Sequence, residues 1–350
     1  MKPNYSEYLT DALSINPAEE ALRDTLLPLL PDSIIDSHTH ASHEKFINAF
    51  EMPPHLLSHM MSTFPDVNIE QSNEIDKLLM PGKSIQKLRF AHVYPGMDHK
   101  GVTEYINENR NEGDGTALFG LSETKEDIEY TINELRTGKY SALKMYYLSS
   151  KVPKTNLYDY FPREVLSVAE TEEVPIILHL PHSLYNSQQE VDQLMNEYSD
   201  LKVILAHIGV ANVPKPELDG ILSSFAKHPN LYVDTAMVDS QEIALAALKH
   251  LTPKRVLYGS DEPLNLMRVV TYFNPDLNTD RVLTEYPYHW ADKHEQDKWR
   301  HLADKPFVHS QWHQLNALTG AVRALKLSTK NENRALESIY YDNSKQIFNF

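Results

Sequence analysis

The sequence predicts a (β/α)₈ (TIM) barrel, preceded by a helical extension and carrying long loops after its first and eighth strands. Three observations support this fold class: eight short apolar runs, amphipathic segments between them, and a length of 350 residues. Most of the apolar runs are hydrophobic at consecutive positions, as expected for parallel strands that are covered on both faces. The repeated alternation of strand and helix favours a closed barrel, with an open doubly wound sheet as the alternative.

The predicted strands, in chain order, are residues 33–38, 88–94, 116–121, 141–146, 175–179, 202–207, 231–235 and 255–260. The clearest helical patterns are at residues 125–136, 163–172, 188–198, 216–227 and 241–250. We expect Ser240 to be the N-cap of the last of these helices. Residues 1–32 precede the first strand and predict one or two helices. Residues 33–350 are expected to form one barrel domain, because the sequence contains no linker or internal repeat.

Two long segments interrupt the alternation, at residues 41–87 and 264–315. The first and eighth strands of a closed barrel are neighbours, so both segments are expected over the same side of its mouth. We expect them to form a lid or a wall of the substrate site, with simple packing on the barrel rim as the alternative. The pair His309 and His313 lacks an H-E-x-x-H context, and we interpret it as helix-surface or rim residues.

Composition excludes several classes of protein. The formal charge of −16, from 33 basic and 49 acidic residues, argues against a nucleic-acid partner. The absence of cysteine excludes disulfides, thiolate metal sites and a cysteine nucleophile. No stretch approaches the ~20 apolar residues of a membrane span, and the N-terminus lacks the layout of a signal peptide. We therefore expect a cytoplasmic protein that does not bind membranes.

Imidazoles and a carboxylate stand where four of the predicted strands end. His38 and His40 end the first strand, His179 ends the fifth, His207 ends the sixth, and Asp261 follows the eighth. A lone histidine at a strand end is more commonly a hydrogen-bonded residue than a metal ligand. The joint pattern at the catalytic end of a barrel instead favours a divalent metal site. Zn²⁺ suits these ligands best, and Mn²⁺, Fe²⁺ and Co²⁺ are the alternatives.

The segments IIDSHTH, VPIILH, VILAHIG and VLYGSDEP resemble the metal-dependent amidohydrolase superfamily, and most closely its amidohydrolase-2 branch. The resemblance extends from Ile34 to the end of the chain. It implies a barrel in which His38, His40, His179 and Asp261 surround one divalent ion. In that arrangement Asp261 acts as the general base. The resemblance also implies a homodimer, since barrels of this branch are often dimers.

The resemblance gives His207 a catalytic role, in contact with the metal-activated water or the substrate. His207 then steadies the attacking hydroxide or polarises the carbonyl group of the substrate.

Lys144, at the end of the fourth predicted strand, has three interpretations. In binuclear relatives a carboxylated lysine at this point bridges two metals, so Lys144 is a candidate ligand of a second ion, with His207 beside it. Alternatively, its ammonium group contacts a substrate carboxylate, or Lys144 is purely structural. One metal ion without a carbamate is the preferred arrangement.

Other candidates follow from position along the chain. Tyr146, two residues beyond Lys144, and His182 and Arg268, which follow predicted strands, are candidate substrate contacts. The alternatives are a hydrogen bond at the rim for His182 and a solvated helix position for Arg268. Asp234, near the end of the seventh strand, is a candidate to orient a metal-bound histidine. His92 ends the second strand and either faces the site or is a buried structural residue.

The predicted function is hydrolysis of an amide, cyclic amide or lactone bond of a small molecule by metal-activated water. Some lyases of the same branch use similar ligands, so a non-oxidative decarboxylase or hydratase of a small carboxylic acid is the alternative. Many decarboxylases of the branch replace the first H-x-H with a glutamate-containing variant, whereas this chain keeps both histidines. A binding protein that has lost its chemistry is disfavoured, because all five polar positions are present.

Overall fold

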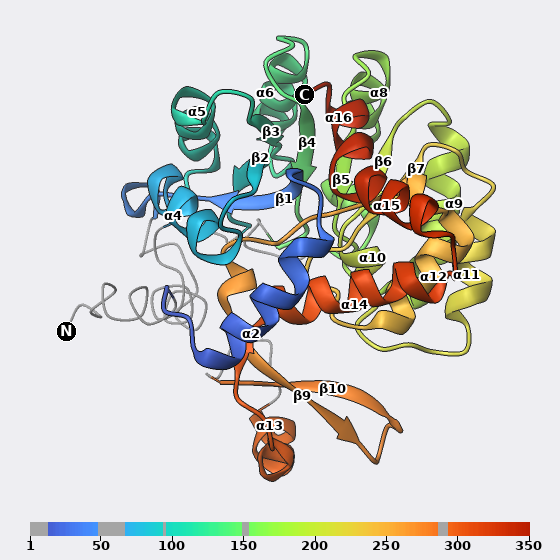
Figure 1. Ribbon diagram of the computed structural model, residues 1–350. Helices are drawn as coiled ribbons and strands as arrows, with labels where there is room; N and C mark the ends of the chain where they lie inside the picture. Colours follow the sequence, from blue (N-terminus) through green and yellow to red (C-terminus); the bar gives the residue numbers. More distant parts are fainter. Residues whose placement is uncertain (1–12, 48–66, 94–95, 149–153, 286–292) are drawn as a thin grey trace.

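The computed structural model describes residues 13–47, 67–93, 96–148, 154–285 and 293–350. Its main sheet has eight strands in the order β1-β2-β3-β4-β5-β6-β7-β8, and every neighbouring pair is parallel. The strands are β1 (Ser33–Ala41), β2 (Ser84–Ala91), β3 (Gly115–Phe119), β4 (Ala142–Met145), β5 (Ile176–Leu178), β6 (Val203–Leu205), β7 (Leu231–Asp234) and β8 (Val256–Leu257). Helices cover the outside of this sheet (Figure 1). The predicted (β/α)₈ barrel is therefore confirmed, and each strand overlaps its predicted run.

The barrel closes between β1 and the residues that follow the short strand β8. Thr39 and Glu262 form a parallel bridge. The His40 amide donates to the Glu262 carbonyl at 2.7 Å, and the Asp261 amide donates to the His38 carbonyl at 2.8 Å. The segment that closes the barrel is thus the segment that carries Asp261.

The outer helices are α4 (Ile69–Leu79), α5 (His99–Asn109), α6 (Lys125–Leu135), α8 (Arg163–Thr171), α9 (Leu184–Glu197), α11 (Leu218–Phe225), α12 (Gln241–Leu251), α14 (Ser310–Ala324), α15 (Thr329–Glu337) and α16 (Asn343–Phe348). Ser240 caps α12 as predicted, because its Oγ accepts the Ile243 amide. Helix α9 begins a turn earlier than predicted, after Ser183. Ser183 is a residue type preferred at the N-cap, but its side chain makes no capping hydrogen bond there.

The interior of the barrel is apolar and is closed at the N-terminal ends of the strands. Leu88, Ala142 and Ile204 belong to one buried cluster with Ile347 and Phe348 of α16. The C-terminal helix therefore plugs one end of the barrel. Chemistry is left to the opposite end, where the strands finish.

The N-terminal extension contains α2 (Pro17–Leu26) and a short 3₁₀ turn at Leu27–Leu29. Asn16 and Glu19 form a capping box at the start of α2. Glu19 is fully buried and also accepts the His309 amide at 2.7 Å, and its carboxylate lies 2.8 Å from His309 Nδ1. His309 is therefore a buried partner of the extension, and its interpretation as a helix-surface or rim residue is wrong. The division into a 1–32 extension and one 33–350 domain stays a prediction.

The segment after β8 forms a second, three-stranded antiparallel sheet that the sequence analysis did not predict. Its strands are β9 (Arg268–Asn274), β10 (Thr279–Thr284) and β11 (Val308–His309), in the order β10-β9-β11. The β9–β10 hairpin projects from the barrel, and α13 (Lys293–Trp299) lies beside it (Figure 1). In the segment after β1, Glu44–Phe46 form a 3₁₀ turn, and residues 48–66 lie outside the described residues. The expected lid or wall over the mouth stays a prediction.

Among the helices of the described residues, none has the length and apolar composition that crossing a membrane requires.

Candidate metal centre

A β-bulge in β1 positions the first two histidines of the site. Asp36 pairs with Lys87 of β2 and Thr39 pairs with Arg89, so β1 has one extra residue between these two pairs. A bulge re-aims side chains, and bulges are common next to active sites. His38 lies in this bulge and His40 lies just beyond it.

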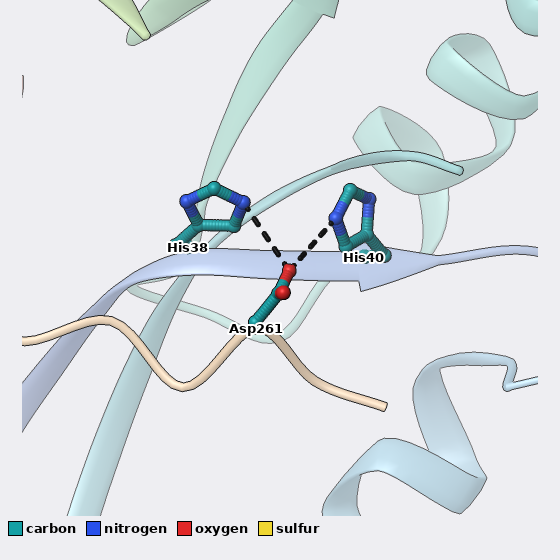
Figure 2. Close-up of side chains that lie close together, drawn as sticks. All are labelled: His38, His40 and Asp261. Atoms are coloured by element: carbon teal, nitrogen blue, oxygen red, sulfur yellow. Dashed lines mark hydrogen bonds and ion pairs between the residues drawn. The ribbon is translucent and has the colours of Figure 1, made fainter. Parts of the chain in front are cut away.

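The imidazoles of His38 and His40 converge on the carboxylate of Asp261 (Figure 2). Asp261 Oδ1 lies 3.4 Å from His38 Nε2 and 3.1 Å from His40 Nε2. Ligand atoms of these three buried residues all lie within 4.8 Å of one another. Within the described residues, no other set of three or more His, Asp or Glu side chains meets that condition.

The oxygens on the far side of each ring can accept the imidazole proton. His38 Nδ1 lies 2.8 Å from Asp234 Oδ2, and His40 Nδ1 lies 3.1 Å from the carbonyl oxygen of Ala91. For His38 the Nδ1 contact is shorter than the 3.4 Å contact of Nε2, whereas each nitrogen of His40 has an oxygen at 3.1 Å. A neutral ring that donates from Nδ1 has its lone pair on Nε2, and that is the form in which both rings would bind a metal ion between them and Asp261.

A divalent cation fits this arrangement. Zn²⁺ bonds of about 2.0–2.2 Å in tetrahedral geometry separate neighbouring ligand atoms by about 3.3 Å. The observed separations of 3.4 and 3.1 Å are close to that value. The three residues present thus suit one divalent ion, in both donor type and spacing.

The charge states of the site also suit metal ligands. Burial would raise the pKa of Asp261, but the imidazoles of His207, His40 and His38 together lower it below its ordinary value. Burial lowers the pKa of His38 to about 4, in spite of the neighbouring Asp234 carboxylate. Burial lowers the pKa of His179 well below its ordinary value. An ionised carboxylate and neutral imidazoles are the forms that bind metals.

His179 and His207 lie in the same mouth but outside the group of three. The His207 ring centroid is 4.9 Å from that of His38 and 5.1 Å from that of His179. His207 Nδ1 lies 2.8 Å from the Ala236 carbonyl, and His179 Nδ1 lies 3.0 Å from the Leu180 carbonyl. Their Nε2 lone pairs are therefore also left available. The predicted role of His179 as a fourth ligand stays a prediction.

Lys144 is buried at the end of β4. Its Nζ lies 5.1 Å from the centroid of the Phe90 ring and 5.9 Å from that of Tyr146. Burial lowers the pKa of Lys144 to about 8, although Asp234 and Asp261 favour its charged form. Among the described residues no carboxylate oxygen lies within salt-bridge distance of Lys144 Nζ, so Asp234 and Asp261 act on its charge only from farther away.

The three predicted substrate contacts lie in different places. The Tyr146 ring packs edge-on against His179, with centroids 4.8 Å apart, at the wall of the mouth. His182 is exposed in the loop after β5. Arg268 begins β9, where its Nη2 donates to the Ser14 carbonyl and its Nε lies 3.6 Å from Glu19. These contacts of Arg268 tie the extension to the second sheet.

Two residues that support the site had no assigned role in the sequence analysis. The Phe90 ring lies 5.0 Å from His38 and 4.7 Å from His40, so it packs against both imidazoles. A side chain at Gly259 would meet His38 Cβ at 2.7 Å. Gly259 in the YGSD segment is the sequence feature that could have indicated this close approach. His92, considered earlier, stacks on His40 with centroids 5.0 Å apart.

A family model described as amidohydrolase matches residues 124–350, which is more than half of the chain. The chain belongs to the amidohydrolase family. This confirms the family expected from the strand-end motifs, and the protein is therefore an enzyme of the amidohydrolase type. A search of curated proteins finds no match.

Solved structures with the same fold include several amidohydrolases. One is an amidohydrolase from Burkholderia multivorans, with TM-score 0.56 and 11% identity, covering 91% of this chain and 99% of that one. Another is assigned as a 2-pyrone-4,6-dicarboxylic acid hydrolase from Pseudomonas putida, with TM-score 0.55 and 13% identity, covering 91% and 98%. A third is 5-carboxyvanillate decarboxylase from Novosphingobium aromaticivorans, complexed with manganese, with TM-score 0.54 and 11% identity, covering 91% and 96%. At identities of 11–13%, these structures support the fold of this amidohydrolase and nothing about its substrate.

We expect Gly259→Ala to lower the affinity for Zn²⁺ by about 10-fold or more, because the added methyl group displaces His38. Overpacking should also cost about 1–3 kcal/mol of unfolding free energy. Competition with a chromophoric chelator and thermal unfolding measure the two effects.

Gly220→Ala on α11 is the matched control, since nothing lies within 4 Å of the added Cβ. It should leave Zn²⁺ affinity unchanged and stabilise the helix slightly. Equal Zn²⁺ affinities for the two variants would contradict the tight fit between Gly259 and His38.

Proposed function

We propose that this amidohydrolase is a metal-dependent hydrolase that cleaves an amide, cyclic amide or lactone bond of a small molecule. One observation carries the proposal. The Nε2 atoms of His38 and His40 face Asp261 Oδ1 at the catalytic end of the barrel. A divalent ion held there acidifies water and polarises a carbonyl group. We propose Zn²⁺, which favours nitrogen and carboxylate ligands, with Mn²⁺, Fe²⁺ or Co²⁺ as alternatives.

Asp261 is the proposed general base. Its Oδ1 faces the two imidazoles, and no contact of Oδ2 is present among the described residues. Asp261 Oδ1 is the atom that would help to hold the ion, and Oδ2 would then be placed to accept a proton from the attacking water.

His207 is the proposed second catalytic residue. Because its Nδ1 proton is held by the Ala236 carbonyl, a neutral His207 offers only a lone pair at Nε2. It can then accept a hydrogen bond from the attacking water and hold that water in place. Polarising the substrate carbonyl would require the imidazolium form, which has a second N–H. We therefore favour the water-positioning role.

Lys144 is the proposed contact for an anionic group of the substrate. A buried ammonium without an acidic partner is costly, and a bound carboxylate would supply the missing charge. The aromatic rings of Phe90 and Tyr146 beside it suit a flat or conjugated substrate. A carbamate on Lys144 that bridges a second metal is the alternative.

Further parts of the proposal depend mainly on the sequence. His179 is kept as a fourth ligand, and Tyr146 and His182 as substrate contacts. Contacts of Arg268 with Glu19 and Ser14 weaken its assignment as a substrate contact. The homodimer and the cytoplasmic location also stay predictions.

The test of the function is a substrate panel of lactones, cyclic and linear amides, and aromatic or unsaturated acids. Proton and CO₂ release are followed with the protein as purified, after chelation, and after Zn²⁺ is restored. We expect a lactone or amide to be hydrolysed, chelation to abolish turnover, and Zn²⁺ to restore it. Asp261→Asn should lower kcat by about 10²–10⁴-fold at saturating metal, because the base is lost.

Asp32→Asn, an exposed carboxylate just before β1, is the control and should retain full turnover. Turnover that survives complete removal of metal would contradict the proposal. CO₂ release from acids, or hydration of a double bond, without hydrolysis of any lactone or amide would establish the lyase alternative. One structure of this fold is that of 5-carboxyvanillate decarboxylase, so both readouts belong in the panel.

We expect Lys144→Met to raise KM about 10–100-fold for a substrate with a carboxylate, since a charged hydrogen bond is lost. A neutral analogue of the same substrate should be hydrolysed as by the wild type. The control is Lys139→Met, at an exposed lysine before β4. It should change the KM for neither the carboxylate substrate nor its neutral analogue. An equal loss with both substrates would refute the anion contact and favour the carbamate or a structural role.

A further inference from the structure

We propose that Asp234 is a positioning residue that fixes the tautomer of His38 and the backbone of His207 at the same time. The proposal rests on the metal centre described above. It goes further by identifying proton placement, rather than negative charge, as what Asp234 contributes. No contact of Asp234 with substrate or metal is required.

The Asp234 carboxylate is buried at the end of β7 and uses both of its oxygens as acceptors. Oδ2 lies 2.8 Å from His38 Nδ1. Oδ1 accepts the backbone amide of His207 at 2.8 Å and that of Ala236 at 3.1 Å. Two of the three donors are main-chain N–H groups, which can never act as acceptors.

One of those amides belongs to an unusual backbone segment. His207, Ile208, Gly209 and Val210 all have positive φ, with values of 56°, 49°, 67° and 59°. Left-handed conformation costs about 1–2 kcal/mol for each non-glycine residue. The Asp234 hydrogen bond holds the first residue of this turn, and with it the ring that lies 4.9 Å from His38. One carboxylate thereby positions two imidazoles of the site.

The three hydrogen bonds of Asp234 make an asparagine at position 234 incompatible with the metal site. The Oδ1 atom of the asparagine must accept the His207 and Ala236 amides, because an NH₂ group in that place would face two other donors with no acceptor. Its NH₂ group then faces His38 Nδ1 and donates to it. His38 must therefore move its proton to Nε2, the atom that faces Asp261. The heavy atoms stay in place, but the lone pair needed by the metal is gone.

Alanine at the same position has the opposite balance of effects. It removes all three hydrogen bonds, so the left-handed turn loses its anchor and the fold is less stable. It leaves His38 free to take either tautomer, however, including the one that binds metal. Asp234→Asn should therefore bind metal more weakly than Asp234→Ala, although it is the more stable variant. If Asp234 contributed only its charge or only its packing, the more stable variant, Asp234→Asn, would not bind metal more weakly than Asp234→Ala.

The test measures Zn²⁺ affinity, thermal stability and the His38 tautomer of both variants. We expect Zn²⁺ affinity to fall about 100-fold in Asp234→Asn and about 10-fold in Asp234→Ala, the range known for residues that orient metal-bound histidines. The tautomer is read from ¹⁵N chemical shifts of the metal-free protein. Wild type should carry the His38 proton on Nδ1, and Asp234→Asn should carry it on Nε2.

Asp114→Asn is the matched control. Asp114 is a buried carboxylate whose two oxygens accept the Lys87 amide and Arg89 Nε, both at 2.9 Å. Its replacement should reduce stability and leave Zn²⁺ affinity and the His38 tautomer unchanged.

The possible failures are distinguishable. A wild-type protein that binds no Zn²⁺ would overturn the metal centre, while the tautomer in metal-free protein still decides the role of Asp234. An Nδ1 proton on His38 in Asp234→Asn would overturn this inference, as would tighter Zn²⁺ binding by Asp234→Asn than by Asp234→Ala. If Asp234→Ala fails to fold, the comparison of wild type with Asp234→Asn suffices.

Discussion

Closure of the barrel between β1 and the residues after β8 is the constraint on which the site depends. The backbone bonds of His40 to Glu262 and of Asp261 to His38 bring both ends of the sheet together. The same two bonds set Asp261 beside both histidines of β1. Residues more than 200 positions apart in sequence thus become neighbours, because the segment after β8 pairs with β1 through the Thr39–Glu262 bridge. Folding the barrel and assembling the candidate metal centre are, on this account, one event.

The proton positions of the histidines follow from a second constraint, the acceptors behind the rings. Four imidazoles in the mouth have Nδ1 beside an oxygen acceptor, and those acceptors are the Asp234 carboxylate and the carbonyls of Ala91, Leu180 and Ala236. A neutral ring that donates its Nδ1 proton to this acceptor presents a lone pair at Nε2. Three of these acceptors are main-chain carbonyls, so only the one at Asp234 can be changed by a side-chain substitution. This is why Asp234 is the informative position.

Much of this arrangement could be predicted from the sequence because it is local. Consecutive apolar residues that end in His38, His179 or His207 mark both a buried parallel strand and its catalytic end. Asp234 could also be predicted as an orienting residue from its place near the end of a strand. The bulge that re-aims His38 could not be predicted, since it depends on pairing between β1 and β2.

Long-range partners account for the remaining differences. The burial of His309 depends on Glu19, which is 290 residues away in sequence. No local sequence pattern around either residue predicts this contact. Arg268 was a candidate substrate contact or a helix residue, and its place at the start of β9 could not be predicted because that strand is recognisable only with its partner β10. His179 lies outside the group formed by His38, His40 and Asp261. Hydrophobic periodicity predicts which strand ends in a histidine, but it does not predict the distances between side chains at the ends of different strands. Fold class and candidate ligands are thus readable from the sequence, whereas the selection among them requires the folded geometry.

The central claim is that one divalent ion binds among His38, His40 and Asp261. Anomalous diffraction at the zinc edge from crystals grown with Zn²⁺ tests it most directly. The account predicts one strong peak within bonding distance, about 2.0–2.2 Å, of His38 Nε2, His40 Nε2 and Asp261 Oδ1. A peak elsewhere, or no peak at a Zn²⁺ concentration that saturates binding in solution, would contradict it.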